Sequence, residues 1–293
     1  MQESFLKYLE YEKRYSKHTI LSYKLDLSQL SSYIKNTSPE FDLENANHLL
    51  IRGWIVSLVE SEIQPKSINR KIASLRSYYK FLLRQGTIQK DPTSKIKILK
   101  TSRKLPQFVN EKDMNLLLDN CEFNNDFEGA RDRLVLEMLY GTGIRLTELI
   151  NLKGSNLNFH NRTIKVLGKR NKERVIPFSV SLEKVIKQYQ VERNKLTNGY
   201  ENQNLIVTGS GESCYPMLIY RIVKKYLNLF TTIDKRSPHV LRHTFATHLL
   251  NKGAELNAVK DLLGHSSLAA TQVYTHNSLD KLKSVFDQAH PKA

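Results

Sequence analysis

Six polar side chains beyond residue 140 have types that could act together on a phosphate group. They are two arginines, two histidines, a lysine and a tyrosine: Arg145, Lys169, His239, Arg242, His265 and Tyr274. Guanidinium groups bind phosphate oxygens through paired N–H donors and stay charged. Imidazoles can donate to the same oxygens or move a proton, and a phenol oxygen can attack phosphorus. The set therefore predicts phosphoryl transfer, in which cations stabilise the charge of the transition state.

These residues stand in four short segments. The segments are GTGIRLTELINL (141–152), VLGKRNKERVIP (166–177), SPHVLRHTFATHLL (237–250) and LLGHSSLAATQVYTH (262–276). Arg145 follows a Gly-Thr-Gly turn, and His239 and Arg242, three residues apart, share one face of a helix. Tyr274 lies nine residues after His265. A free phenol has a pKa of about 10, so neighbouring cations or a base must help it to react.

Taken singly, each residue also has a structural interpretation. Arg145 can cap a helix or pair with Glu148, and Lys169 can be a solvated lysine of an exposed turn. His239 can simply begin a helix, and Tyr274 can be one of 14 tyrosines that fill cores. Two neighbouring histidines are predicted to be structural: His243 and His248. The order of all six residues together is what favours chemistry.

That order resembles the tyrosine site-specific recombinases of the phage integrase family. The sequence carries G-x-R-x-x-E, G-K-x-x-K-E-R, H-x-x-R, L-G-H and a tyrosine in succession, and the resemblance extends over essentially the whole chain. It is closest to the bacterial Xer recombinases of the XerC/XerD type, which resolve chromosome dimers. The short tail ending in AHPKA fits these proteins better than integrases with an additional arm-binding domain.

The resemblance implies a role for each residue. Tyr274 is the nucleophile that forms a 3′-phosphotyrosyl link, and Lys169 is the general acid that protonates the leaving 5′ hydroxyl, with Lys172 as its rival. Glu148 supports Arg145. Strand exchange then passes through a Holliday junction without cofactor, ATP or metal. The sequence agrees, because it has neither a Walker A loop nor a metal-ligating cluster.

The implied partners are a double-stranded DNA target site and further recombinase subunits, in a homo- or hetero-tetramer on two DNA sites. An FtsK-like DNA translocase is a further possible partner, and the expected task is the resolution of chromosome dimers at a dif-like site. An integrase or transposase of a mobile element would share the chemistry. So would a type IB topoisomerase, although the small N-terminal lobe and apolar tail favour an assembling recombinase. A non-catalytic DNA-architectural protein would explain the charge but not the six residues.

The charge of the chain favours a polyanion. The sequence has 45 Lys+Arg against 29 Asp+Glu, a net charge of +16. Residues 63–110 hold 12 basic and one acidic side chain, whereas residues 1–62 hold 7 basic and 9 acidic ones. The two cysteines make no disulfide scaffold, and no apolar run is long enough to span a membrane. These features predict a cytoplasmic protein with no membrane partner.

Helical periodicity predicts the elements of the first part. Four helices are expected, at 2–14, 18–35, 45–60 and 66–86. The last has an apolar stripe: Ile68, Ile72, Leu75, Tyr79 and Leu82. On its opposite face lies a row of cations that we expect to contact the DNA backbone: Lys66, Arg70, Lys80 and Arg84. Residues 91–108 have two prolines and five basic side chains and are predicted to form a basic linker.

The second part is predicted to be mixed but mainly helical. Helices are expected at 111–120, 127–140, 145–152, 180–195 and 216–229, with further helices in the last 55 residues. Strands are expected at 163–167, 173–177 and 204–207, the first two forming a hairpin around the polar turn. The tail at 278–293 carries Leu279, Leu282, Val285 and Phe286 at helical spacing. It is expected to dock on a neighbouring subunit, with packing on its own domain as the alternative.

The predicted fold class is therefore mainly α with a small β-sheet. An N-terminal four-helix DNA-binding domain (core-binding, SAM-like) at 1–90 is followed by the linker at 91–108 and a catalytic domain at 109–293. The subunit-exchange helix is placed at about 278–287. The two lobes are expected to close around DNA as a C-shaped clamp.

Overall fold

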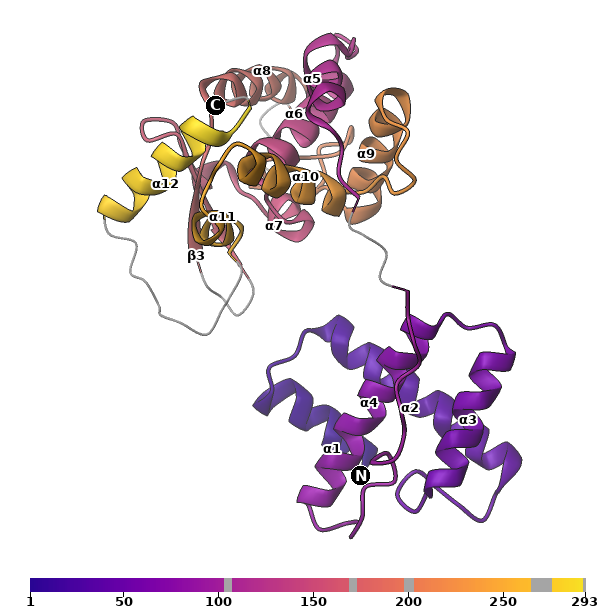
Figure 1. Cartoon of the computed structure of the whole chain (residues 1–293). Helices are drawn as coiled ribbons and strands as arrows, with labels where there is room; N and C mark the ends of the chain where they lie inside the picture. The colour runs from indigo at the N-terminus through magenta and orange to yellow at the C-terminus, as the bar shows by residue number, and fades with distance from the viewer. Residues whose placement is uncertain (103–106, 169–172, 198–202, 265–275, 292–293) are drawn as a thin grey trace. The chain divides into compact units, whose positions relative to one another are not determined.

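The computed structural model describes residues 1–102, 107–168, 173–197, 203–264 and 276–291 (Figure 1). The chain divides into two compact units, Met1–Lys104 and Leu105–Ala293. Both are mainly helical, and the second also contains a small antiparallel sheet. The predicted fold class, mainly α with a small β-sheet, is confirmed. No helix in the described part of the chain is long and apolar enough to cross a membrane.

The N-terminal unit has the helices that the sequence predicts. In its described residues they are α1 (Gln2–Lys7) with the π-helical turn η1 (Tyr8–Glu12), α2 (Lys17–Thr37), α3 (His48–Glu60) and α4 (Pro65–Arg84). Polar caps begin two of them, because the side chain of Ser16 accepts from the amide of Thr19 and that of Asn47 from the amide of Leu50. Pro65 begins α4, where its missing N–H is not needed.

The core of this unit lies between α1, α2, α3 and α4. The predicted stripe of α4 is fully turned inward: Ile68, Ile72, Leu75, Tyr79 and Leu82 are each at most 1% exposed. Trp54 of α3 is 3% exposed and packs in the same core. Burial of these apolar side chains drives the association of the helices. It also leaves the opposite face of α4 to polar residues.

The segment after α4 packs on the same unit. Ile96 is buried, and its carbonyl accepts from Arg76 at 2.6 Å. The side chain of Asn69 bonds both the N–H and the carbonyl of Leu99, at 2.8 and 2.9 Å. Residues up to 99, which the sequence assigns to the linker, are therefore held along α4 by hydrogen bonds between α4 side chains and their backbone.

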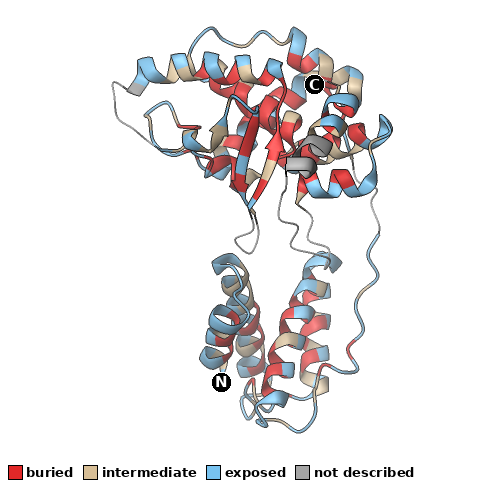
Figure 2. Cartoon of the chain, turned by 90° about the vertical axis from the view of Figure 1, so that its left-hand side faces the viewer, coloured by how far each residue is buried: buried red, intermediate tan, exposed pale blue. Residues whose placement is uncertain are grey.

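The C-terminal unit is built around α6 (Phe127–Thr142), which is buried along most of its length. Figure 2 shows buried residues gathered in the interior of this unit. Helices α8, α9 and α10 pack on α6. The described helices of this unit are α5 (Glu111–Asn120), α6, α7 (Leu146–Ile150), α8 (Val180–Thr197), α9 (Pro216–Phe230), α10 (Pro238–Asn251), α11 (Leu256–Leu263) and α12 (His276–Ala289). A 3₁₀ turn, Gly154–Asn156, follows α7. These helices agree with the predicted ones to within a few residues.

The predicted hairpin is also present. Strand β2 (Thr163–Leu167) pairs antiparallel with β3 (Glu173–Pro177), from Thr163 opposite Pro177 to Leu167 opposite Glu173. The sheet order in the described residues is β1-β2-β3, where β1 is Leu157–Asn158.

The prediction of a strand at 204–207 is wrong. Leu205, Ile206 and Val207 are fully buried, which explains the apolar pattern. However, the amide of Leu205 donates to the carbonyl of Leu152 at 2.6 Å, and that of Val207 donates to the hydroxyl of Tyr189 at 3.1 Å. The segment thus satisfies its buried backbone through a loop and a side chain instead of a strand ladder, and isolated bridges are all that it forms.

Helix α12 packs on its own unit in this structure, against α10, α11 and β3. Phe286 is 1% exposed and its ring is stacked on His290, with 4.9 Å between the ring centroids. The side chains of Leu279 and Leu282 lie outside the described residues. This is the alternative arrangement of the tail named above, and docking on a neighbouring subunit stays a prediction.

Candidate active site

Arg145 lies where α6 turns into α7. Gly143 ends α6 with a left-handed backbone (φ 59°), and a Cβ there would come within 2.5 Å of the Phe245 ring, so both the turn and the packing require glycine. Arg145 is then the N-cap of α7. Its amide donates to Glu148 Oε2 and its Nη1 donates to Glu148 Oε1, both at 2.8 Å. The side chain of Arg145 remains 31% exposed.

Arg242 approaches the same turn from α10. It is 7% exposed, and its guanidinium donates to the carbonyls of Gly143 and, at 2.7 Å, of Leu263. Burial, together with the positive charges of Arg145 and Arg174, lowers the pKa of Arg242 to about 9. The group is still cationic near neutral pH, and an anion bound beside it would relieve the repulsion. The two arginines predicted to bind one phosphate are thus brought to one place.

Arg174 of β3 joins this cluster. It is 4% exposed, and its Nη1 and Nη2 donate to Glu148 Oε1 and Oε2 at 2.6 and 2.8 Å. This arginine is the last residue of the G-K-x-x-K-E-R motif, and the family resemblance implied no role for it. The spacing from Ile176 could have indicated that Arg174 is buried. Residues two apart in a strand share a face, and Ile176 is fully buried.

Glu148 lies between Arg145 and Arg174 and accepts hydrogen bonds from both. Burial by itself would raise the pKa of this carboxyl, but the paired guanidinium of Arg174 and the bonds from Arg145 outweigh it and lower the pKa to about 2. Glu148 is therefore ionised, and together with Arg145, Arg174 and Arg242 it leaves the cluster with a net positive charge. Such a cluster is suited to an anionic group.

The carboxyl end of α11 is held by the same arginines. Leu262 accepts from Arg174 Nε at 3.1 Å, Leu263 accepts from Arg242, and Gly264 accepts from Arg145 Nη2 at 2.8 Å. These carbonyls end a helix and have no partner within it, so the guanidinium groups satisfy them and meet the negative end of the helix dipole. The bonds fix the chain immediately before residue 265.

The histidines of α10 divide into two kinds. His239 is exposed in the first turn, one turn before Arg242 on the same helix. His243 is half-buried, and burial and the nearby His239 lower its pKa. His248 is 2% exposed and lies between the hydroxyl of Tyr140, at 3.0 Å, and the carbonyl of Val109, at 2.9 Å. His248 thus ties the start of this unit to its core, in the structural position that the sequence predicts.

Three of the predicted catalytic residues lie outside the described residues: Lys169, His265 and Tyr274. Their neighbours in sequence are described. Gly168 directly precedes Lys169 after β2, Gly264 directly precedes His265, and α12 begins two residues after Tyr274. The roles of these three residues stay predictions.

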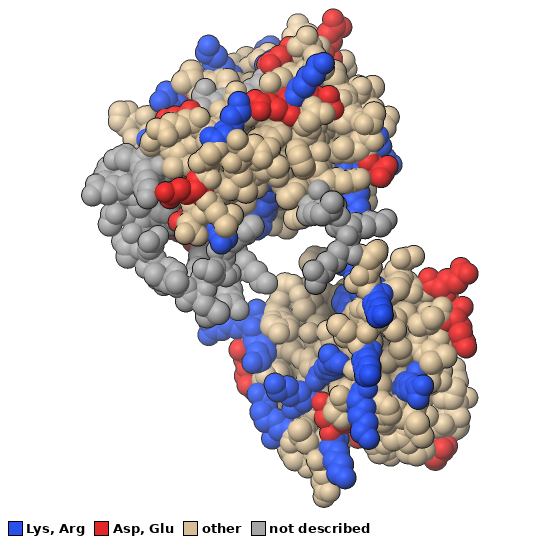
Figure 3. Space-filling view, viewed as in Figure 1, with Lys and Arg blue, Asp and Glu red and all other residues tan. Residues whose placement is uncertain are grey.

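The predicted DNA contacts of α4 are exposed on the N-terminal unit, where Lys and Arg side chains gather (Figure 3). Arg70 donates to both oxygens of the buried Asp26, at 2.5 and 2.7 Å, while its own side chain is 49% exposed. Arg84 lies 4.6 Å above the ring of Tyr8. For Lys66 and Lys80, the described residues contain no ion-pair partner. These two lysines therefore keep the full charge that a phosphate backbone would attract.

Sequence comparisons cover both units. The phage integrase family profile matches residues 107–280, and that of the phage integrase N-terminal SAM-like domain matches residues 3–86. The chain is 37% identical over 316 residues to the tyrosine recombinase XerC of Chlorobaculum parvum, covering 99% of this chain and 94% of that protein. It is 35% identical over 295 residues to XerC of Listeria innocua, covering 100% and 98%.

Solved structures show the same fold. A XerH site-specific recombinase bound to a palindromic difH substrate in a post-cleavage complex superposes with a TM-score of 0.73 at 23% identity, covering 97% of this chain and 83% of that one. The Tn1549 transposon integrase in complex with circular intermediate DNA gives 0.66 at 19% identity, covering 96% and 97%. Both likenesses concern the fold.

Proposed function

The chain belongs to the phage integrase family of tyrosine recombinases, DNA strand exchange enzymes, and on that premise we propose that it acts through a covalent bond between Tyr274 and DNA. The observation that carries the proposal is the convergence of Arg145 and Arg242 on one turn, with Glu148 holding the first of them. Two guanidinium groups at one place can bind both non-bridging oxygens of a single phosphate.

The proposed step conserves bonds. The phenol of Tyr274 gives its proton to a neighbouring histidine, His239 or His265, and its oxygen attacks phosphorus. The bond between phosphorus and the 5′ oxygen breaks, and Lys169 gives a proton to that oxygen. One phosphate ester replaces another, so a second 5′ hydroxyl can reverse the step with no input of ATP. Arg145, Arg242 and the two histidines, His239 and His265, act on the charge that develops on the phosphate oxygens.

The biological task we propose is the resolution of chromosome dimers at a dif-like site in the cytoplasm. A tetramer would carry out the reaction, and the DNA would pass through a Holliday junction intermediate. Full-length identity of 35–37% to two XerC recombinases supports this task. In that assembly α12 would dock on a neighbouring subunit, and a DNA translocase would act on the complex. The alternative task is integration of a mobile element, which shares the fold and the chemistry.

Covalent trapping tests the chemistry and the site together. The protein is incubated with fragmented host DNA carrying nicks, denatured, and the DNA that remains attached is sequenced. The wild type should retain DNA at one recurrent sequence, whereas Tyr274→Phe should bind duplex DNA normally and retain none. Attachment that persists in Tyr274→Phe would refute the assignment of the nucleophile. A single chromosomal locus would favour dimer resolution, and the ends of a mobile element would favour integration.

A matched pair of variants tests the general acid. Lys169→Ala should slow cleavage, and a 5′-phosphorothiolate substrate, whose sulfur leaves without a proton, should restore it. If the phosphorothiolate substrate restores cleavage by Lys172→Ala but not by Lys169→Ala, the general acid is Lys172.

A further inference from the structure

Arg174 has no part in the reaction as proposed above, yet it is built into the cluster that holds Arg145. It lies on β3 between the exposed Glu173 and the half-buried Val175, on the strand face that turns inward with Ile176. Burial of an arginine has a large desolvation free energy unless its N–H groups are hydrogen-bonded. Its contacts therefore indicate what it does.

The fork of Arg174 fixes the plane of the Glu148 carboxylate. Each oxygen of Glu148 accepts one bond from Arg174 and one from Arg145: Oε1 accepts from both Nη1 atoms, and Oε2 accepts from Arg174 Nη2 and from the amide of Arg145. The carboxylate is thus held by a rigid group on one side and holds Arg145 on the other. A lysine could supply the charge of Arg174 but not the paired geometry.

The third donor of Arg174 fixes the other side of Arg145. Arg174 Nε bonds the carbonyl of Leu262, two residues before the Gly264 carbonyl that Arg145 Nη2 binds. A Cβ on Gly264 would come within 2.8 Å of Arg174 Cδ, so the arginine stem packs directly on this turn. Glu148, Arg174, residues 262–264 and Arg145 close a ring of contacts.

We propose that Arg174 is a positioning residue for Arg145, holding Glu148 and the turn 262–264 so that the remaining N–H groups of Arg145 face the phosphate. The proposal rests on the proposed function for its consequence and on the ring of contacts for its basis. Arg174 itself is 4% exposed and its Nε, Nη1 and Nη2 donate to Leu262 and Glu148, so it acts through these groups. Loss of a partner that orients a metal ligand typically lowers activity by about 10- to 100-fold, and we expect a loss of similar size for a partner that orients Arg145.

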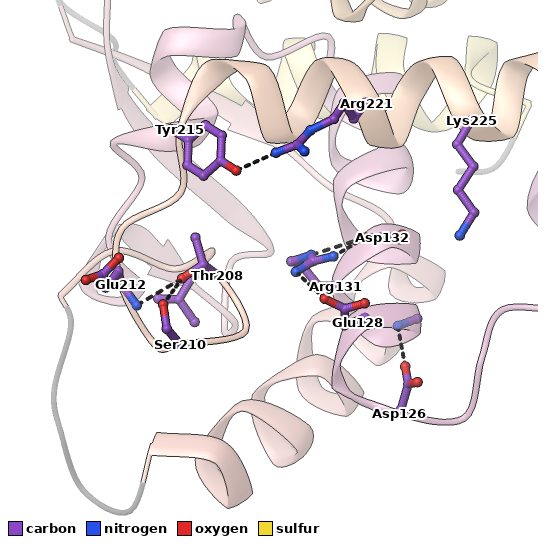
Figure 4. Close-up of polar contacts among 12 residues, drawn as sticks. Asp126, Glu128, Arg131, Asp132, Thr208, Ser210, Glu212, Tyr215, Arg221 and Lys225 are labelled. Atoms are coloured by element: carbon purple, nitrogen blue, oxygen red, sulfur yellow. Dashed lines mark hydrogen bonds and ion pairs between the residues drawn. The ribbon is translucent and has the colours of Figure 1, made fainter.

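The test compares Arg174→Lys with Arg131→Lys. Arg131 is an equally buried arginine of the same unit, paired with Asp132 through Nε and Nη2 at 3.1 and 2.9 Å (Figure 4). It lies 11 residues before the end of α6, or about 16 Å along the helix axis. On the nicked duplex recovered by covalent trapping, at saturating concentration, Arg174→Lys should form the covalent complex about 10- to 100-fold more slowly. Arg131→Lys should stay within about twofold, because its partners lie outside the ring.

A second substrate separates positioning from simple damage. When one non-bridging oxygen of the scissile phosphate is replaced by methyl, the phosphate is neutral and the demand on Arg145 falls. The defect of Arg174→Lys should then shrink to less than about threefold, as should that of Arg145→Ala. A defect of equal size on both substrates, or no defect on either, would overturn the proposal.

A measurement without DNA keeps the inference independent of the proposed function. The Nε–H signal of Arg145, assigned by its loss in Arg145→Lys, should have a heteronuclear NOE as high as that of Arg131 in the wild type. In Arg174→Lys it should fall towards that of the exposed Arg162. A mobile Arg145 in the wild type would refute the positioning role even if Arg174→Lys does not fold. Failure of the wild type to trap any DNA would instead refute the proposed function.

Discussion

The ion pairs of Glu148 give a stability difference that depends on pH. The ordinary pKa of this carboxyl is 4.5, and in the folded protein it is lowered to about 2. A shift of this size corresponds to about 3 kcal/mol, since one pKa unit is about 1.4 kcal/mol. The side chain is 3% exposed, so solvent screens little of this energy. Glu148→Gln should therefore lower the free energy of unfolding of the C-terminal unit by about 3 kcal/mol at pH 7.

The sign of the pH dependence follows from the direction of the shift. Because the folded state holds the proton less tightly than the unfolded state, the stabilisation is complete above pH 4.5 and is lost as the pH falls towards 2. At pH 3.5 the difference between wild type and Glu148→Gln should have shrunk by about 1.4 kcal/mol. The glutamine cannot titrate, so its own curve lacks this contribution.

Urea unfolding at pH 7, 5, 4 and 3.5, followed by a fluorescent label on the C-terminal unit, measures the difference. Glu183→Gln is the matched control. Glu183 pairs with Lys187 at 2.6 Å on the surface of α8, where the lysine is 60% exposed. This variant should change stability by less than about 0.5 kcal/mol at every pH. A Glu148→Gln difference that stays constant between pH 5 and 3.5, or that equals the control, would refute the ion-pair geometry described above.

Two further predictions concern the turn of the active site and the DNA-binding face. Gly143→Ala should destabilise the C-terminal unit by about 3 kcal/mol in the same assay, because it adds a Cβ at a left-handed position against Phe245, whereas Gly154→Ala, which has open space, should cost less than about 1 kcal/mol. Equal effects of the two would contradict the packing. Lys80→Ala should reduce the salt dependence of binding to a mixed-sequence duplex by about one phosphate contact and leave stability unchanged. A salt dependence that is unchanged in Lys80→Ala would show that this lysine does not contact DNA. Arg70→Ala should reduce the salt dependence in the same way and should also destabilise the N-terminal unit by about 2 kcal/mol, because it removes a partner of the buried Asp26.

Much of the fold could be predicted from the sequence because its signals are local. The apolar stripe of α4 repeats at helical spacing, and the hairpin flanks a polar turn that begins with glycine. The strand predicted at 204–207 failed for the opposite reason. An apolar run shows that a segment is buried, but its backbone partners, Leu152 and Tyr189, lie elsewhere in the chain.

The candidate site divides in the same way. Motif order alone singled out Arg145, Glu148, His239 and Arg242, and the pairing of Arg145 with Glu148 spans three residues of one helix start. Arg174 is 26 residues from Glu148, and no local pattern states which carboxylate an inward arginine will meet. The same holds for Arg70, whose partner Asp26 is 44 residues away.

The sequence by itself determined the family, the helices and hairpin, and the order of the residues suited to phosphoryl transfer, since these follow from short-range spacing and residue type. Tertiary structure decided which charged side chains remain exposed for a ligand and which are paired with other groups of the protein. Packing brings β3, the end of α6 and the end of α11 together, and there buried guanidinium groups must find carboxylate or carbonyl partners. Those partners are chosen by the three-dimensional contacts between distant segments, which spacing along the chain does not specify.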